Sequence, residues 1–215
     1  MSTFPSLGHH RFRRACFGFG FGFLAVAVAC NLMPTASAQD GQRERAAWRF
    51  GAVAHNLHIG GYGDMQSHEG GANLEGELIG RQIDWLNAVW SPRPYVMVSG
   101  NLGGDTSFVA TGLYWGLPDV WGWQPELGFG LALHDGELHN PYPLSDPRAA
   151  DYQREHQLLG TRTLFRDTIA FDHSIGRGRS VGIVFEHLSN AGNLFGHRDN
   201  ESLNELGLRF TVQIR

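Results

Sequence analysis

The stretch "NELGLRFTVQI", residues 204–214, alternates between apolar and polar side chains without a break. The two sets are Leu206, Leu208, Phe210, Val212 and Ile214, and Gly207, Arg209, Thr211 and Gln213. A period of two predicts a β-strand with one apolar and one polar face. A soluble barrel would turn the apolar row inward. Because this row is wholly apolar, we expect it to face lipid and the polar row to face a barrel interior.

Seven earlier segments resemble this strand, and most come near the roughly 9–11 residues that a tilted strand needs to cross a bilayer. The eight predicted strands are residues 46–55, 74–79, 93–101, 107–116, 125–134, 163–173, 180–189 and 204–214. In residues 125–134 large apolar side chains alternate with Gly128, Gly130 and Ala132, and small residues suit the crowded interior of a small barrel. The sequence therefore predicts an all-β protein, an eight-stranded antiparallel outer-membrane β-barrel. A soluble sandwich or a periplasmic barrel is the alternative.

The predicted connections divide into short turns and one long loop. "LGGD" at residues 102–105 predicts a hairpin, and "IGRGR" at residues 175–179 predicts a tight turn. The polar residues 135–156 predict an external loop, with a helical turn near residues 147–159. We find no linker or internal repeat, which indicates a single barrel domain over residues 39–215.

The first 38 residues have the pattern of a cleaved secretory signal peptide. Arg11, Arg13 and Arg14 form the positive region, an apolar run follows, and "ASA" at residues 36–38 is the cleavage site before Gln39. An uncleaved anchor over the same apolar run remains open, as does a lipoprotein site at Cys30. Each alternative still predicts export through the inner membrane.

Charge and cysteine content narrow the classes of function. Both cysteines precede the cleavage site, so the mature chain has no thiol or disulfide chemistry. The 177 mature residues carry 14 basic and 21 acidic side chains, a formal charge of −7, which argues against a nucleic-acid partner. No residue pattern calls for a cofactor.

Candidate chemistry lies in "VGIVFEHLSNAGN", residues 181–193. Parity places His187 and Ser189 on the same lipid-facing row as Ile183 and Phe185, at the end of the strand. A charged residue on that face costs roughly 2–4 kcal/mol at the midplane and about 0–1 near the headgroups, so the pair fits only near the interface. A serine nucleophile needs an adjacent base, and His187 has the spacing for that role.

The motif "HLSNAG", with the final strand "NESLNELGLRF" after it, resembles the outer-membrane lipid A 3-O-deacylases of the PagL type. That family has eight-stranded barrels and the motif His-x-Ser-Asn-Ala. The resemblance is strongest over residues 181–215 and looser over "ELGFGLALHDGE" and "GTRTLFRDTIAF". Over residues 39–120 it extends only to the general pattern.

The resemblance implies Ser189 as nucleophile, His187 as base, and the Asn190 side chain and Gly192 backbone as oxyanion donors. The family's third catalytic residue is a Glu, and the corresponding position here is Asn204, with Glu201 in the preceding turn as a substitute. An Asn can orient a His but stabilises the imidazolium less than a carboxylate does. The implied substrate is lipid A of lipopolysaccharide, in contact with outer-membrane lipid, and a homodimer is left open.

Other readings of the sequence remain as alternatives. "GRSVG" at residues 178–182 matches the nucleophile-elbow pattern, but an alternating strand follows Ser180 where that pattern requires a helix. His134 and His139 in "HDGELH" lie near acidic residues, although a metal needs ligands that converge from several elements. A non-enzymatic structural barrel is the alternative function.

Overall fold

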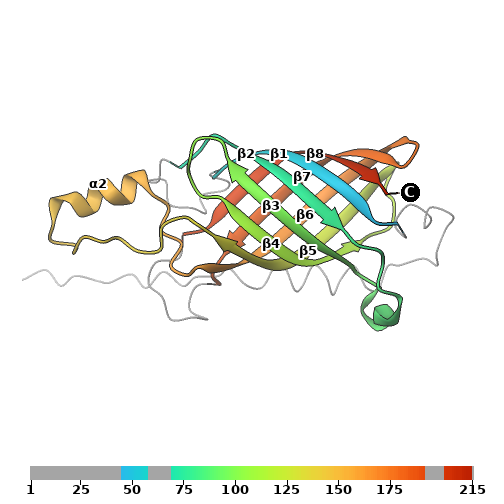
Figure 1. Ribbon diagram of the computed structural model, residues 1–215, viewed down its shortest axis with the longest axis horizontal. Helices are drawn as coiled ribbons and strands as arrows, with labels where there is room; N and C mark the ends of the chain where they lie inside the picture. The colour runs from blue at the N-terminus through green and yellow to red at the C-terminus, as the bar shows by residue number, and fades with distance from the viewer. Residues whose placement is uncertain (1–44, 58–68, 192–200, 215) are drawn as a thin grey trace, which may run out of the picture. The chain divides into compact units, whose positions relative to one another are not determined.

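A computed structural model describes residues 45–57, 69–191 and 201–214. Its eight strands are β1 (Ala47–Ala54), β2 (Ala72–Ile79), β3 (Arg93–Asn101), β4 (Phe108–Gly116), β5 (Trp123–His134), β6 (Thr163–Gly176), β7 (Arg179–Ser189) and β8 (Leu203–Gln213). Each strand pairs antiparallel with the next, and β8 pairs with β1 to close the barrel (Figure 1). The predicted fold class is confirmed, with strand ends within three residues of the predicted ones.

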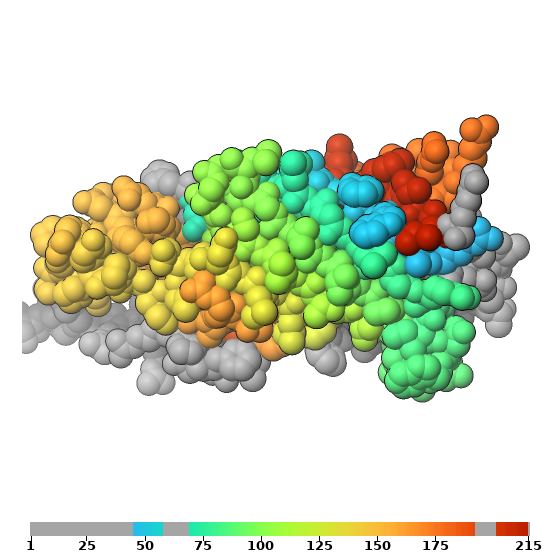
Figure 2. Space-filling model, viewed as in Figure 1, coloured from blue at the N-terminus to red at the C-terminus, as the bar shows by residue number. Residues whose placement is uncertain are grey.

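The predicted parity of the last strand holds. Leu206 and Leu208 are exposed on the outer wall, whereas Arg209 and Thr211 are buried inside. An apolar outer face and a polar interior are typical of a barrel that lies in lipid. The closed sheet also satisfies the backbone hydrogen bonds of the strands internally, as a membrane requires. In the space-filling view, side chains cover the outer wall over β3, β4 and β5 (Figure 2).

The small residues of β5 make room for rings that point into the barrel. A Cβ at Gly128 would collide with the ring of Tyr114, and one at Gly130 would collide with the hydroxyl of Tyr95. Tyr95 and Tyr114 stack with their ring centroids 4.4 Å apart. The interior is therefore packed with side chains at this level.

Charged side chains from β1, β2, β5, β6 and β8 fill one part of the barrel interior. Arg49 Nη1 lies 3.0 Å from Glu77 Oε2 and 3.0 Å from Glu126 Oε1. Arg209 Nη2 lies 2.8 Å from Glu126 Oε1 and also binds Asp172. Buried charges are tolerated only when they are paired and hydrogen-bonded, and these groups pair with one another.

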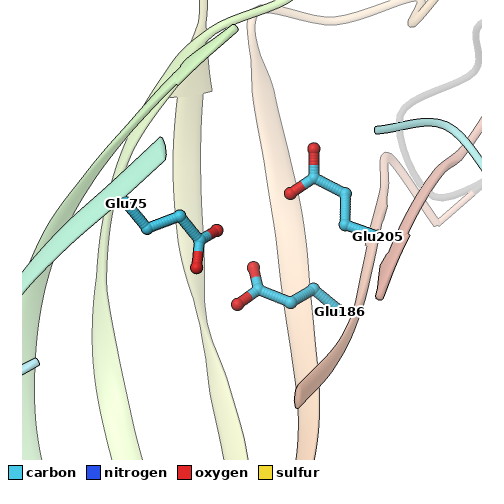
Figure 3. A group of neighbouring side chains, drawn as sticks. All are labelled: Glu75, Glu186 and Glu205. Atoms are coloured by element: carbon cyan, nitrogen blue, oxygen red, sulfur yellow. The ribbon is translucent and has the colours of Figure 1, made fainter. Parts of the chain in front are cut away.

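Three further carboxylates, from β2, β7 and β8, converge inside the barrel (Figure 3). One oxygen from each of Glu75, Glu186 and Glu205 lies within 4.8 Å of the others. Arg166 binds both oxygens of Glu186, and His55 Nδ1 lies 2.7 Å from Glu205 Oε1. Since two of the three carboxylates already have cationic partners, we assign the cluster to the interior charge network.

Among the described residues, two helices lie outside the barrel wall. α2 (Pro147–Glu155) lies in the β5–β6 loop, where the sequence predicted a helical turn, and the side chain of Asp146 accepts a hydrogen bond from the Arg148 amide at its start. η2 (Asp84–Val89), a 3-10 helix between β2 and β3, was not predicted and lies at the opposite end of the barrel from α2 (Figure 1). Within the described ranges, no helix is both long and apolar enough to cross a membrane. The predicted signal peptide falls outside the described residues.

Candidate active site

His187 and Asn204 face each other across β7 and β8. They are direct cross-strand partners, and His187 Nδ1 lies 2.7 Å from Asn204 Oδ1. Because an amide oxygen can only accept a hydrogen bond, Nδ1 carries the proton and donates. In the neutral ring, Nε2 is then left as an acceptor, which is the form a general base requires.

Ser189 lies two residues after His187, on the same outer row of β7. It is 9% exposed and stands at the end of the strand, where its cross-strand partner is Phe165 on β6. The rings of Phe165 and Phe129 stack with centroids 5.8 Å apart. The hydroxyl group therefore lies beside an apolar surface on the outer wall.

Asn190 is fully buried directly after the strand. Its Nδ2 donates a hydrogen bond of 2.9 Å to the carbonyl oxygen of Leu159 in the β5–β6 loop. This bond uses one of the two amide hydrogens. Ala191 has a φ of 59°, so the chain turns in the left-handed region immediately after Asn190. Gly192, the other predicted oxyanion donor, lies outside the described residues.

Glu201 contacts Leu158 in the β5–β6 loop. Its Oε2 accepts a hydrogen bond of 2.6 Å from the Leu158 amide, and its own amide donates to the Leu158 carbonyl at 3.1 Å. Of the two residues predicted for the orienting position, the structure places Asn204 against the imidazole. Glu201 instead ties the start of β8 to the β5–β6 loop.

The sequence reasoning assigned no role to Asp167, which also belongs to this site. Asp167 on β6 is the direct cross-strand partner of His187, opposite the side that Asn204 occupies. Its carboxyl is exposed on the outer row and lies near enough to His187 for their charges to interact. The sequence carried a signal for Asp167, since its carboxylate shares a row with Phe165 and Ile169. An acidic side chain that faces lipid is energetically costly, so such a residue indicates a functional site.

The two alternative motifs, residues 178–182 and the histidine pair of residues 134–139, do not form part of this site. Ser180 lies inside β7, paired with Thr211, so the G-x-S-x-G stretch has no strand-turn-helix geometry. His134 points into the barrel, where its Nε2 lies 2.7 Å from the carbonyl oxygen of Thr161.

We compared the chain with curated proteins, with solved structures and with protein-family models. A search of curated proteins finds no significant match. Among solved structures, the chain is similar to the crystal structure of the outer membrane enzyme PagL, at 16% identity over 78% of this chain and 99% of that one, with a TM-score of 0.49. It is also similar to Neisserial surface protein A, at 11% identity over 79% and 97% of the two chains and a TM-score of 0.48. OprG from Pseudomonas aeruginosa matches at 9% identity over 80% and 99%, with a TM-score of 0.35.

The family comparison covers nearly all of the described chain. The family model described as "Lipid A 3-O-deacylase (PagL)" matches residues 46–213, a range that includes all eight strands and both sides of the His187–Asn204 contact. The chain belongs to the PagL lipid A 3-O-deacylase family.

Proposed function

We propose that this chain is an outer-membrane serine hydrolase that removes the ester-linked 3-O acyl chain from lipid A. Ser189 is the nucleophile, His187 the general base, and Asn204 the residue that orients the imidazole. The observation that carries the proposal is the bond from His187 Nδ1 to Asn204 Oδ1 on the outer wall, on the row that Ser189 shares.

In the first step, the Ser189 hydroxyl oxygen attacks the ester carbonyl carbon while His187 Nε2 takes the hydroxyl proton. The tetrahedral intermediate then collapses, and the C–O bond to the sugar breaks. The imidazolium gives its proton to the leaving sugar oxygen. The products of this step are an acyl-serine at position 189 and lipid A with a free hydroxyl group.

In the second step, water attacks the acyl-serine with His187 again acting as base. The fatty acid leaves and the Ser189 hydroxyl is restored. Asn204 holds the imidazole in the reactive tautomer through both steps, although an amide stabilises the imidazolium less than a carboxylate would.

The negative charge on the intermediate needs hydrogen-bond donors. The side-chain amide of Asn190 and the backbone amide of Gly192 are the proposed donors. Each such donor contributes roughly 10²–10³-fold to the rate in serine hydrolases.

The position of the site suits a lipid substrate. Ser189 ends β7 on the face whose other members, Ile183 and Phe185, contact lipid in this proposal. Ester groups of lipids lie close to the interface, where polar side chains on a barrel wall cost only about 0–1 kcal/mol. His187, Ser189 and Asn204 all come from one chain, so a homodimer would leave the site complete in each copy.

Mass spectrometry of lipid A from cells that express the wild type, Ser189→Ala and His187→Ala tests the proposal. Of these three strains, we expect only the wild type to yield lipid A that lacks one ester-linked acyl chain. Ser180→Ala is the matched control, because it changes a serine at the other end of the same strand and should leave the activity intact. Identical lipid A from all four strains, with the proteins present in the outer membrane, would establish the non-enzymatic barrel instead.

The proposal includes export of the chain and removal of residues 1–38 as a signal peptide. N-terminal sequencing of the protein recovered from outer membranes should begin at Gln39. A sequence that begins at Met1 would support the uncleaved anchor.

A further inference from the structure

His55 lies one residue beyond β1, and the proposed mechanism does not use it. Its side chain is 0% exposed, and both ring nitrogens face carboxylates. Nδ1 lies 2.7 Å from Glu205 Oε1, and Nε2 lies 3.4 Å from Glu69 Oε2. Carboxylates only accept hydrogen bonds, so both ring nitrogens can donate only when the ring is the doubly protonated cation.

The energetics agree with that geometry. Burial alone would lower the pKa of His55, but the hydrogen bonds to Glu205 and Glu69, together with their negative charges, outweigh burial and raise this pKa to about 9. Burial acts to raise the pKa of Glu69, yet hydrogen bonds from His55 and the Gln157 amide bring it below its ordinary value. At neutral pH an imidazolium therefore bridges carboxylates from two parts of the chain.

One side of this bridge leads to Asn204. Glu205 is the next residue of β8, and its inward carboxylate also accepts a hydrogen bond of 2.8 Å from Asn73 Nδ2. Two residues after His55, the Leu57 amide donates to the Asn204 carbonyl oxygen at 2.7 Å. The chain around His55 thus holds the start of β8 through the side chain of Glu205 and the backbone of Asn204.

The other side of the bridge leads to Asn190. Glu69 Oε1 accepts a hydrogen bond of 3.0 Å from the Gln157 amide, and Asn56 Nδ2 donates to Gln157 Oε1 at 3.2 Å. Two residues further on, the Leu159 carbonyl accepts the side-chain amide of Asn190 at 2.9 Å. Both routes from His55 therefore end at residues with a proposed role in the reaction.

We infer that His55 is a positioning residue for deacylation, because its bridge between Glu205 and Glu69 fixes Asn204 against His187 and Asn190 beside Ser189. The inference rests on the proposed function.

A buried ion triad adds little net stability, since desolvation offsets most of the attraction between its charges. The effect of the triad on this site is therefore geometric. Loss of the triad should lower kcat more than it lowers the amount of folded protein. Misplacement of a reacting group by about 1 Å can lower a rate about 100-fold.

The test compares the wild type, Ser189→Ala, His55→Gln and the double variant His55→Met/Glu205→Gln. The double variant removes one cation and one anion together, so it keeps the interior charge balance if His55→Gln fails to fold. Methionine cannot hydrogen-bond to either side, so the bridge is lost. His173→Gln is the control, because His173 is an exposed histidine that bonds to the Gly122 carbonyl at the opposite end of the barrel.

Folded protein is counted by heat-dependent electrophoretic migration, and kcat and KM are measured on lipid A in detergent micelles. We expect kcat per folded molecule to fall about 10- to 100-fold in the double variant, with KM changed by less than about 3-fold. The control should match the wild type. A wild-type kcat in the folded double variant, or a loss of folded protein alone, would overturn the inference.

Amide hydrogen exchange on the same proteins measures how firmly the His55 bridge holds the neighbouring backbone, independently of activity. We expect faster exchange at Leu57, Gln157 and Leu158 in the double variant, and unchanged exchange at Gln213, whose amide bonds to Gly178 at the far end. If the wild type and Ser189→Ala both leave lipid A intact, the proposed function fails and exchange alone decides the inference. Equal exchange at all four amides would then refute it.

Discussion

In the proposed mechanism, the strength of His187 as a base depends on Asn204. Its amide oxygen accepts from His187 Nδ1 at 2.7 Å, so it fixes the tautomer without supplying a negative charge. Asn204→Leu removes the acceptor, and we expect deacylation to slow about 100-fold or more, in the range lost with general-base function. Asn204→Glu restores the carboxylate found elsewhere in the family and should be at least as active as the wild type. Steady-state rates on lipid A measure both, and an unchanged rate in Asn204→Leu would contradict the assigned role.

Asp167 makes a second prediction at the scale of single residues. Its carboxyl flanks His187 on the outer wall, so Asp167→Asn should weaken the electrostatic support of the imidazolium and slow deacylation about 10-fold. The same change removes a charge from a lipid-facing row, so unfolding midpoints in denaturant should rise or stay the same. A variant that lost stability and activity together would indicate a structural role for Asp167.

At the scale of elements, the His55 bridge holds the end of β1 to the start of β8 and predicts a dependence of stability on pH. The groups that face the imidazolium are Glu205 from β8 and Glu69 from the segment before β2. The pKa of His55 rises from 6.5 in the unfolded chain to about 9 in the fold, so its contribution is complete below pH 6.5. This pH-linked part of the stability, on the order of 3 kcal/mol, is lost as the pH rises from 6.5 through 9. It compares the protonated with the neutral ring inside the fold and does not give the net value of the bridge, in which desolvation offsets most of the attraction.

Denaturant midpoints measured between pH 6 and pH 10 check this dependence. The wild type should lose stability over that interval, and the control His173→Gln should follow it. His55→Met/Glu205→Gln should show a flatter curve, because it lacks the titrating group. Parallel curves for all three proteins would show that other groups cause the loss.

At the scale of the whole molecule, the outward apolar rows predict how the barrel responds to charge. Leu208 is 67% exposed on the wall formed by β8 and its neighbours. Leu208→Arg should destabilise the barrel in lipid by roughly 2–4 kcal/mol if this position lies at the midplane. Leu144 is 93% exposed in the β5–β6 loop, so Leu144→Arg is the matched control and should change little. Folding titrations in bilayers measure the difference, and equal stabilities would argue against a lipid-facing row.

The fold could be predicted from the sequence because each strand carries its own local signal. The period of two in residues 204–214 identified both faces of β8, and the same parity placed His187 and Ser189 together on the outer wall. Strand ends were less accurate, since pairing with a neighbour extends β6 to Gly176, past the last apolar residue of the predicted segment. η2 was missed because its six residues carry no regular period.

The site was predictable only where the motif lay within one strand. Asp167 is 20 residues from His187 in sequence, so its place depends on the β6–β7 register. The contact between His55 and Glu205 joins residues 150 positions apart. Such contacts depend on how strands align, and the pattern of a single strand does not contain that alignment.

Closure of the barrel between β1 and β8 has a consequence for when the enzyme becomes active. Asn204 lies on β8, and its position depends on Leu57 and His55 at the end of β1. In the proposed mechanism, His187 therefore has no orienting partner until the first and last strands meet. If the proposed function and export hold, a chain that has not yet closed its barrel carries the nucleophile without a working site. Hydrolysis would then begin only in the membrane where the barrel closes.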